Sequence, residues 1–523
     1  MRRFITAILL AATACPAIAK TVSVEDVSLD RLGVMLRDGQ VSSVDLTQAY
    51  LDRIAAMDRK GPALHAVIAV NPDAIAQARA LDAERKAGHV RGPLHGIPIL
   101  IKDNIETADP LSTTAGSLAL KDNLTRRDAP MIAYLRRAGA VILGKTNLSE
   151  WANIRSTHSM SGWSAVGGLV KNPYVLDRTA CGSSSGSGAA VAASFAAAAI
   201  GTETDGSVVC PSSINGLVGF KPSIGLVSRT HVVPISHSQD TPGPMARSVK
   251  DAAILLSGMV GADPADSATA GAVTKDYTAS LSANGLSGVR VGVLRPEGLS
   301  VDLTQRYEAA LGVLRAAGAV LVEVKSPKLD GLSAAELTVL KTELKADLNT
   351  YLATTPASVK TRTLGAVIAF NREHASTEMP FFAQELFEDA DKTAGLDDPA
   401  YRTARATSLR LAGVEGIDAM LKTAGAQILV EPTYAAAWLS DPIYGDTYEG
   451  QSAAALPAIA GYPHLTVPMG LVRGLPVGLS FIATRNADEA VLRAGYAYEQ
   501  RALPRSAPRY LPTVDIEAAA SAN

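Results

Sequence analysis

Apolar residues follow two periodicities along the first third of the chain. Helical spacing occupies residues 28–56, 72–87 and 130–138. Short apolar runs between these segments predict strands at residues 65–70, 97–101 and 141–144. This alternation of helix and strand predicts an α/β fold in which helices cover a sheet.

The same alternation continues to the end of the chain. Helices are predicted at residues 248–260 and 303–317, and the long stretch 333–424 is helical. Strands are predicted at residues 289–294, 320–324, 465–468 and 476–482. Residues 261–271 indicate a surface connection and not a domain boundary, and the sequence has no internal repeat. We therefore predict one large domain.

The most apolar stretch outside the N-terminus, residues 189–200, is rich in alanine. It is shorter than the roughly 20 residues that a membrane-spanning helix needs, so it predicts a buried helix.

The N-terminus has the three regions of a secretory signal peptide. Two arginines precede an apolar stretch at residues 4–13, and a small-x-small pattern ends at Ala19. We predict a signal peptide at residues 1–19 and a mature domain at 20–523, with its ordered core at about 24–512. A membrane anchor is the alternative, but the apolar run is too short to span a bilayer. The protein is therefore expected to be secreted or periplasmic.

Composition and charge narrow the classes of function. The chain has 523 residues, of which 47% are hydrophobic and 19% charged, so it has enough apolar chain for a large core and is not a disordered polymer. The net charge of −2 gives no electrostatic basis for binding nucleic acid or an anionic membrane. Aromatic residues make up only 5%, which also disfavours a base-stacking surface.

Cysteine and histidine spacing predicts neither a metal nor a cofactor. Only Cys181 and Cys210 follow the signal peptide, too few for a disulfide scaffold. A disulfide or a shared metal is possible for this pair, but the favoured interpretation is two small buried packing residues. The eight histidines are scattered, without an HExxH or similar ligand pair.

Three segments carry residues suited to catalysis. The apolar strand in residues 96–103 (GIPILIKD) ends in Lys102, and burial of a lysine lowers its pKa enough for the neutral amine to act as a base. Residues 181–188 read CGSSSGSG, and residues 201–207 read GTETDGS. Each segment alone is weak, because a lysine more often pairs with an acid and a serine more often caps a turn.

Taken together, the three segments resemble the amidase signature family. The resemblance covers most of the mature chain and extends to residues 147–151, 215–222, 240–245, 461–463 and 474–478. It implies a single large catalytic domain with a mixed central β-sheet covered by helices on both sides.

The family's Ser-Ser-Lys site maps onto three residues of this chain. The resemblance implies that Ser207 is the nucleophile, that Ser183 is a bridging serine after a cis peptide bond from Gly182, and that Lys102 is the base. It further implies an oxyanion hole made by backbone N–H groups, those of Thr204, Asp205, Gly206 and Ser207.

At a few motif positions this chain differs from most members of the family, and these differences narrow the range of expected substrates. Many members have glycine where this chain has Asp205, and the arginine that usually follows the nucleophile is replaced within residues 208–211 (VVCP). The missing cation disfavours a glutamine-amidotransferase subunit, whereas residues 204–211 and 236–241 resemble the peptide amidase branch. That branch hydrolyses C-terminal carboxamides of peptides to the free acid and ammonia through an acyl-enzyme.

An amidase of the same family acting on simple aliphatic or aryl amides is the alternative. In either case the partner is a small amide, and Trp151, Trp163 and Asp205 are candidate substrate contacts. The oligomeric state stays open.

Rival interpretations use other features of the same segments. Residues 182–186 match GxSxG, which would make Ser184 the nucleophile of an α/β-hydrolase esterase with a later histidine such as His464. The residues before it are polar and not a buried strand, and this interpretation leaves Lys102 and Ser207 without a role. A non-catalytic solute-binding protein has no need of these three residues, and a phosphate-binding loop lacks its GK[ST] motif.

Overall fold

The computed structural model describes residues 22–448, 452–502 and 505–514. The predicted signal peptide, its cleavage point after Ala19 and the predicted loose tail from Glu517 all lie outside the described residues.

A mixed sheet of eleven strands forms the centre of the molecule, in the order β1-β3-β2-β6-β8-β7-β12-β13-β11-β9-β10. The strands are β1 (Val67–Val70), β2 (Pro98–Lys102), β3 (Val141–Thr146), β6 (Ala198–Glu203), β7 (Val218–Lys221), β8 (Thr241–Ala246), β9 (Arg290–Leu294), β10 (Val320–Val324), β11 (Ile428–Pro432), β12 (His464–Val472) and β13 (Leu475–Ile482). A separate two-stranded ribbon joins β4 (Trp163–Ser164) to β5 (Gly168–Leu169). The single α/β domain with a mixed sheet is thereby confirmed.

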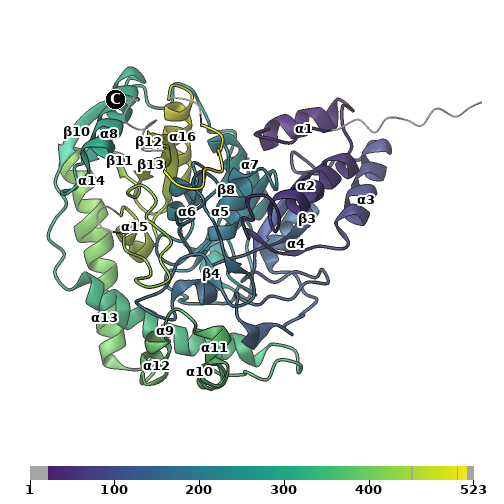
Figure 1. The fold of residues 1–523 in the computed structure, drawn as a ribbon. Coiled ribbons are helices and arrows are strands. Elements are labelled where there is room, and N and C mark those ends of the chain that lie inside the picture. Colours follow the sequence, from purple (N-terminus) through teal and green to yellow (C-terminus); the bar gives the residue numbers. More distant parts are fainter. Residues whose placement is uncertain (1–21, 449–451, 503–504, 515–523) are drawn as a thin grey trace, which may run out of the picture.

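Helices flank this sheet (Figure 1). They are α1 (Leu29–Arg37), α2 (Ser43–Met57), α3 (Ala74–Lys86), α4 (Pro130–Arg137), α5 (Ser185–Ala192), α6 (Val209–Ile214), α7 (Val249–Met259), α8 (Val301–Ala316), α14 (Ala419–Ala424), α15 (Ala455–Ala460) and α16 (Asp488–Glu499). The predicted helical stretch 333–424 contains α9 (Leu332–Ala353), α10 (Leu364–Glu373), α11 (Ala375–Glu378), α12 (Glu385–Asp391), α13 (Pro399–Leu409) and a π-helix, Arg410–Asp418. Figure 1 shows α9 to α13 gathered at one end of the molecule, away from α1 to α3.

The pairing of β2 brings the candidate catalytic residues together at the edge of the sheet formed by the carboxyl ends of its parallel strands. β2 runs parallel to both β3 and β6, with Lys102 opposite Thr146 and Ile101 opposite Ile200. Carboxyl ends of parallel strands meet at the same edge, so the end of β2 lies beside the end of β6. That edge receives Lys102 from one strand and Thr202 from the other.

The alanine-rich stretch 189–200 is not a single helix, contrary to the sequence prediction. Helix α5 ends at Ala192, and residue Ser194 has a positive φ of 58°. The chain then forms β6, which pairs with β2 on one side and β8 on the other. Alanine alone favours a helix, but sheet pairing on both sides outweighs that local propensity.

In the described part of the chain, no helix has both the length and the apolar character needed to cross a membrane.

Candidate active site

Lys102 is fully buried at the end of β2 and contacts three oxygen atoms. Its Nζ lies 2.8 Å from Ser183 Oγ, 2.9 Å from Thr202 Oγ1 and 3.1 Å from the Thr202 carbonyl oxygen. Asn104 Nδ2 donates to the same Thr202 hydroxyl at 2.9 Å. The lysine and the first of the two serines are therefore in direct contact, although 81 residues separate them.

Burial sets the charge state of this lysine. Loss of hydration lowers the pKa of Lys102 to about 7, while the negative charges of Asp240 and Glu203 oppose that decrease. A substantial fraction of the amine is neutral near neutral pH, so it has a lone pair for a proton.

Ser183 lies between the lysine and the rest of the site. It is fully buried, and the Gly182–Ser183 peptide bond is cis, as the family resemblance implies. Its carbonyl oxygen accepts from the Ser149 backbone N–H at 3.0 Å. Gly182 has no room for a side chain, since a Cβ there would lie 2.1 Å from Ser149 Oγ.

Ser207 lies in a turn between β6 and α6 that two buried acids hold. Glu203 Oε2 accepts from the backbone N–H groups of Val208 and Val209, at 2.8 Å and 3.0 Å. Asp240 Oδ1 accepts from the Thr204 hydroxyl at 2.6 Å. The turn is also joined to the serine-rich loop, because the Ser184 N–H donates to the Ser207 carbonyl at 3.2 Å.

These two acids keep raised pKa values. Desolvation raises the pKa of Asp240 to about 6, against the hydrogen bonds that it accepts. It also raises the pKa of Glu203, where the nearby Lys221 ammonium acts in the opposite direction. Burial lowers the pKa of Lys221 to about 8. The turn that carries Ser207 is thus built on buried polar groups.

A cavity of about 350 Å³ opens directly onto Ser207. Thr204, Asp205, Gly182 and Cys181 line it beside the serine. Further lining residues come from distant parts of the chain, namely Ala152, Asn153, Ile154, Ser161, Ile235, Leu340, Tyr434, Trp438, Asp446, Tyr448, Ser452 and Ala455. Aliphatic and aromatic side chains share the wall with polar ones, among them Asn153, Asp205 and Asp446, which suits a small organic ligand that carries polar groups.

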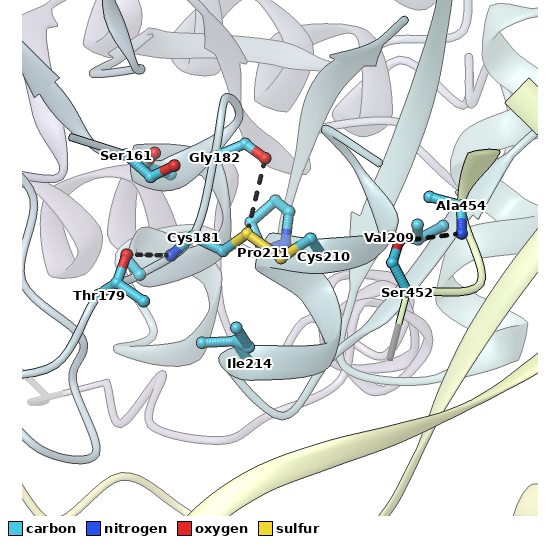
Figure 2. The surroundings of a disulfide bond; sticks show 12 residues. Ser161, Thr179, Cys181, Gly182, Val209, Cys210, Pro211, Ile214, Ser452 and Ala454 are labelled. Carbon is cyan, nitrogen blue, oxygen red and sulfur yellow. Dashed lines mark hydrogen bonds between the residues drawn. A yellow bond between two sulfur atoms is a disulfide. The ribbon is translucent and has the colours of Figure 1, made fainter. Parts of the chain in front are cut away.

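Cys181 and Cys210 form a disulfide, so the expectation of two unpaired packing residues is wrong. Their Cα atoms are 6.0 Å apart. Figure 2 shows the bond between the loop that leads into Gly182 and the first turn of α6. Sequence spacing could not show that a cis loop and the helix after Ser207 face each other, which is the geometry that a disulfide requires.

Asp205 lies on the cavity wall beside a second carboxyl group. Burial, together with the nearby Glu336 and Glu203 carboxylates, raises the pKa of Asp205 well above its usual range. Gln239 Nε2 donates to Glu336 Oε1 at 3.0 Å and to the Thr204 carbonyl at 3.3 Å. Asp205 and Glu336 therefore favour a shared proton over two negative charges.

The two tryptophans predicted as substrate contacts lie in hydrophobic packing. Trp151 packs edge-on against Phe387 with centroids 5.7 Å apart, and Trp163 packs against Phe382 at 5.4 Å. Neither side chain lines the cavity, whereas Asp205 does. The aromatic residues on the wall are Tyr434, Trp438 and Tyr448, which sequence analysis did not single out because no local motif marks them.

The geometry contradicts the Ser184 esterase interpretation. Ser184 is fully buried, and its hydroxyl donates to the Thr202 carbonyl at 3.1 Å. His464 Nε2 is paired with Ser480 Oγ at 2.7 Å, and burial lowers its pKa to about 3. The histidine is therefore held in β12 by another partner.

One cluster in the described residues has ligand types and spacing compatible with a metal ion. The side chains of His237, Glu343 and Asp347 place one ligand atom each within 4.8 Å of the others. Protein donors already bind the Glu343 carboxylate, since Ser238 Oγ lies at 2.5 Å and Tyr401 Oη at 2.7 Å. Hydrogen bonds within the protein therefore already engage the carboxylates of this cluster.

Residues 45–492 match the family model for amidases. The chain belongs to the amidase family. It is accordingly a hydrolase that acts on amide C–N bonds, and the sequence prediction of family and enzyme class is confirmed.

The relatives of this amidase include a peptide amidase of known structure, a probable amidase and an amidotransferase subunit. The native peptide amidase from Stenotrophomonas maltophilia is 50% identical, with a TM-score of 0.89, over 93% of this chain and 99% of that one. A probable amidase of Arabidopsis thaliana is 37% identical over 507 residues, 94% of this chain and 93% of its own. A glutamyl-tRNA(Gln) amidotransferase subunit from Thermobifida fusca is 35% identical over 493 residues, 90% and 95% of the two chains.

Proposed function

We propose that this amidase uses Lys102, Ser183 and Ser207 to hydrolyse the C-terminal carboxamide of peptides to the free acid and ammonia. The observation that carries the proposal is the 2.8 Å contact between Lys102 Nζ and Ser183 Oγ, fully buried beside a cavity that Ser207 lines. A buried lysine with a pKa near 7 and a serine partner is the arrangement that general-base activation of a hydroxyl requires.

In the proposed first half-reaction, Ser207 Oγ attacks the carboxamide carbon. Its proton passes to Ser183, and the Ser183 proton passes to the neutral Lys102 amine. Backbone N–H groups of residues 204–207 stabilise the oxyanion. The proton then returns through Ser183 to the leaving nitrogen, the C–N bond breaks, and ammonia departs from an ester on Ser207.

In the second half-reaction a water molecule attacks that ester. Lys102 again receives a proton through Ser183, now from water, and the proton returns to Ser207 Oγ as the ester bond breaks. The products are a free carboxylic acid and the original enzyme, so no co-reactant besides water is needed.

The cavity wall supports a small peptide amide as substrate. Ile154, Leu340 and Trp438 provide apolar surface for an acyl group, and Tyr434 and Tyr448 add polar atoms. The likeness to a peptide amidase at 50% identity favours the same substrate class. Simple aliphatic or aryl amides remain the alternative substrates in the same cavity.

The test compares four substrates with the wild-type enzyme and with Ser207→Ala. Ammonia and product mass are measured for an amidated dipeptide, its free-acid form, an aliphatic amide and an aryl amide. We expect conversion of the terminal carboxamide alone, with the internal peptide bond intact, and no turnover by Ser207→Ala. A preference for the simple amides would overturn the peptide specificity, and full activity of Ser207→Ala would overturn the mechanism.

We also propose that the protein is exported, to the periplasm or out of the cell. The disulfide supports this proposal, because such bonds persist mainly in oxidising compartments. Mass analysis of the exported protein is expected to find Lys20 as its first residue. Retention of residues 1–19 on a cytoplasmic product would contradict it.

A further inference from the structure

The Cys181–Cys210 disulfide joins the two segments that carry the proposed serine pair. Cys181 stands two residues before Ser183, and Cys210 stands three residues after Ser207. We propose that this bond is a positioning element of the active site, which keeps the Ser207 hydroxyl in reach of Ser183. The inference rests on the proposed function and adds a residue pair that acts on the serines without touching the substrate's reacting atoms.

On the Ser183 side, the disulfide fixes a loop of unusual conformation. Cys181 has a φ of 54°, and its N–H donates to Thr179 Oγ1 at 3.0 Å. Its Sγ contacts the Gly182 carbonyl oxygen at 3.7 Å (Figure 2). A shift of Cys181 therefore moves the peptide group that leads directly into Ser183.

On the Ser207 side, the disulfide reaches the turn through the first turn of α6. The Cys210 N–H donates to the Gly206 carbonyl at 2.8 Å, next to Ser207 itself. Hydrogen bonds also join the loop to this region, from the Ser184 N–H to the Ser207 carbonyl at 3.2 Å, from the Ser184 hydroxyl to the Thr202 carbonyl at 3.1 Å and from Asn215 Nδ2 to the Ala180 carbonyl at 2.9 Å. Neutral hydrogen bonds of this kind restrain two segments less firmly than a covalent bond does.

Other contacts hold the surrounding fold without help from the disulfide. Helix α5 and strand β6 pack in the main hydrophobic core, and β6 is paired on both sides. Lys102 also keeps two contacts with Thr202 that do not involve the loop. Loss of the disulfide is therefore expected to displace Ser183 relative to Ser207 while the sheet stays intact.

The position of Cys181 on the cavity wall gives a direct way to test this. Dithiothreitol donates two electrons and two protons, so that the S–S bond becomes two thiols and the reagent becomes a cyclic disulfide. The thiols are then blocked and counted by mass spectrometry. Cys181→Ala/Cys210→Ala and Cys181→Ser/Cys210→Ser are the matched variants, and both receive the same reductant as controls.

We expect the reduced enzyme and both double variants to lose roughly 10- to 100-fold in kcat at 25 °C, with KM changed less than about 3-fold. Reoxidation of reduced, unblocked enzyme restores kcat, and reductant has no effect on the double variants. Near-ultraviolet circular dichroism and Tm show that each sample is folded at the assay temperature. If a variant is unfolded there, the reduced wild type and the reoxidation step carry the test.

An unchanged kcat in a fully reduced, folded enzyme would overturn the positioning role. A fall in Tm with normal kcat would also overturn the positioning role, because it would show that the disulfide stabilises the fold without affecting catalysis. Ser207→Ala separates this failure from that of the proposed function. If Ser207→Ala stays active, the mechanism itself is wrong, whereas an inactive Ser207→Ala beside a fully active reduced enzyme rejects only the disulfide inference.

Discussion

Lys102 shows how one buried side chain sets the working range of the site. An isolated ammonium in such a place is costly, and burial moves its pKa from 10.5 to about 7. The nearby Asp240 and Glu203 limit the decrease, so the amine titrates close to neutral pH. The neutral form of Lys102, which is the proposed base, is therefore populated near neutral pH.

The pH dependence of activity follows from that pKa. Because only the neutral amine accepts a proton, kcat/KM is expected to rise with pH and to level off above an apparent pKa of about 7. Lys102→Arg keeps the charge but cannot lose its proton, so we expect a decrease of roughly 100- to 10 000-fold. Lys250→Met, at a half-exposed surface ion pair, is the control and retains normal kcat/KM. A flat profile from about pH 5 to 9 would contradict lysine as base.

Asp240 offers a way to move this profile without touching the lysine. Its carboxylate raises the pKa of Lys102, so Asp240→Asn is expected to lower that pKa and shift the rise in kcat/KM to lower pH. The asparagine amide oxygen can still accept from the Thr204 hydroxyl, but the amide nitrogen cannot accept from the Ile235 and Ser236 N–H groups that bind the other Asp240 oxygen, so Tm is measured beside the pH profile. A shift toward higher pH would contradict the electrostatic coupling.

At this scale the sequence predicts the three proposed catalytic residues but not the buried residues that hold them in position. Lys102, Ser183 and Ser207 fall in motifs with family-specific spacing, and the structure places them at one edge of the sheet. The contacts of Glu203 and Asp240 with the turn depend on how distant segments meet, which no local pattern encodes. For the same reason the sequence does not point to the aromatic residues of the wall. It suggests instead Trp151 and Trp163, which pack against phenylalanine rings and are not among the residues that line the cavity.

At the scale of elements, the turn before α6 depends on Gly206. This glycine has a φ of +77°, and a Cβ there would lie 2.4 Å from the Tyr434 hydroxyl oxygen. Two features of the turn therefore require glycine at this position. Its backbone conformation is strained for any other residue, and Tyr434 on the cavity wall leaves no room for a side chain.

Gly206→Ala is expected to lower the free energy of unfolding by about 1–2 kcal/mol from the positive φ alone, and more from the contact with Tyr434. Since Ser207 is the next residue, kcat should fall as well. Gly206→Ala/Tyr434→Phe removes the clashing oxygen and should recover part of the loss in Tm, measured against Tyr434→Phe. A Gly206→Ala enzyme with wild-type Tm and kcat would show that the turn tolerates both.

The boundary between α5 and β6 marks the limit of element prediction from this sequence. Residues 189–200 contain mainly alanine and small side chains, which fit a tightly packed helix and a doubly paired strand equally well. The helix ends where Ser194 turns the chain, and the strand forms because β2 and β8 supply partners on both sides. Strands with β-branched runs, such as β9 and β10, are predictable because their composition favours only one state.

At the scale of the whole molecule, buried charged side chains hold helices α9 to α13 against the rest of the single domain. Arg155, which is fully buried, forms an ion pair with Glu150 and donates to the Glu378 carbonyl at 2.5 Å. Glu378 in turn accepts from the Leu118 N–H at 2.7 Å. Because Leu340 of α9 lines the cavity, this attachment also helps to define the substrate site.

Arg155→Met is expected to destabilise the protein by about 3–5 kcal/mol, since it leaves Glu150 buried without its cation. Glu150→Gln/Arg155→Met removes the unpaired charge and should recover much of that loss. Urea unfolding followed by fluorescence compares the three proteins. Equal stability of the single variant and the wild type would show that the ion pair contributes nothing to the attachment.

The order of the strands across the sheet has a consequence for how the chain is made. Strands β12 and β13 lie between β7 and β11, so within the described sheet residues 464–482 join six strands from residues 67–246 to three from 290–432. A nascent chain that has not yet emerged past residue 482 holds two incomplete sheets, each with an open edge. Open edges pair readily with other chains. Protection of β7 and β11 during synthesis therefore depends on the last strands to leave the ribosome.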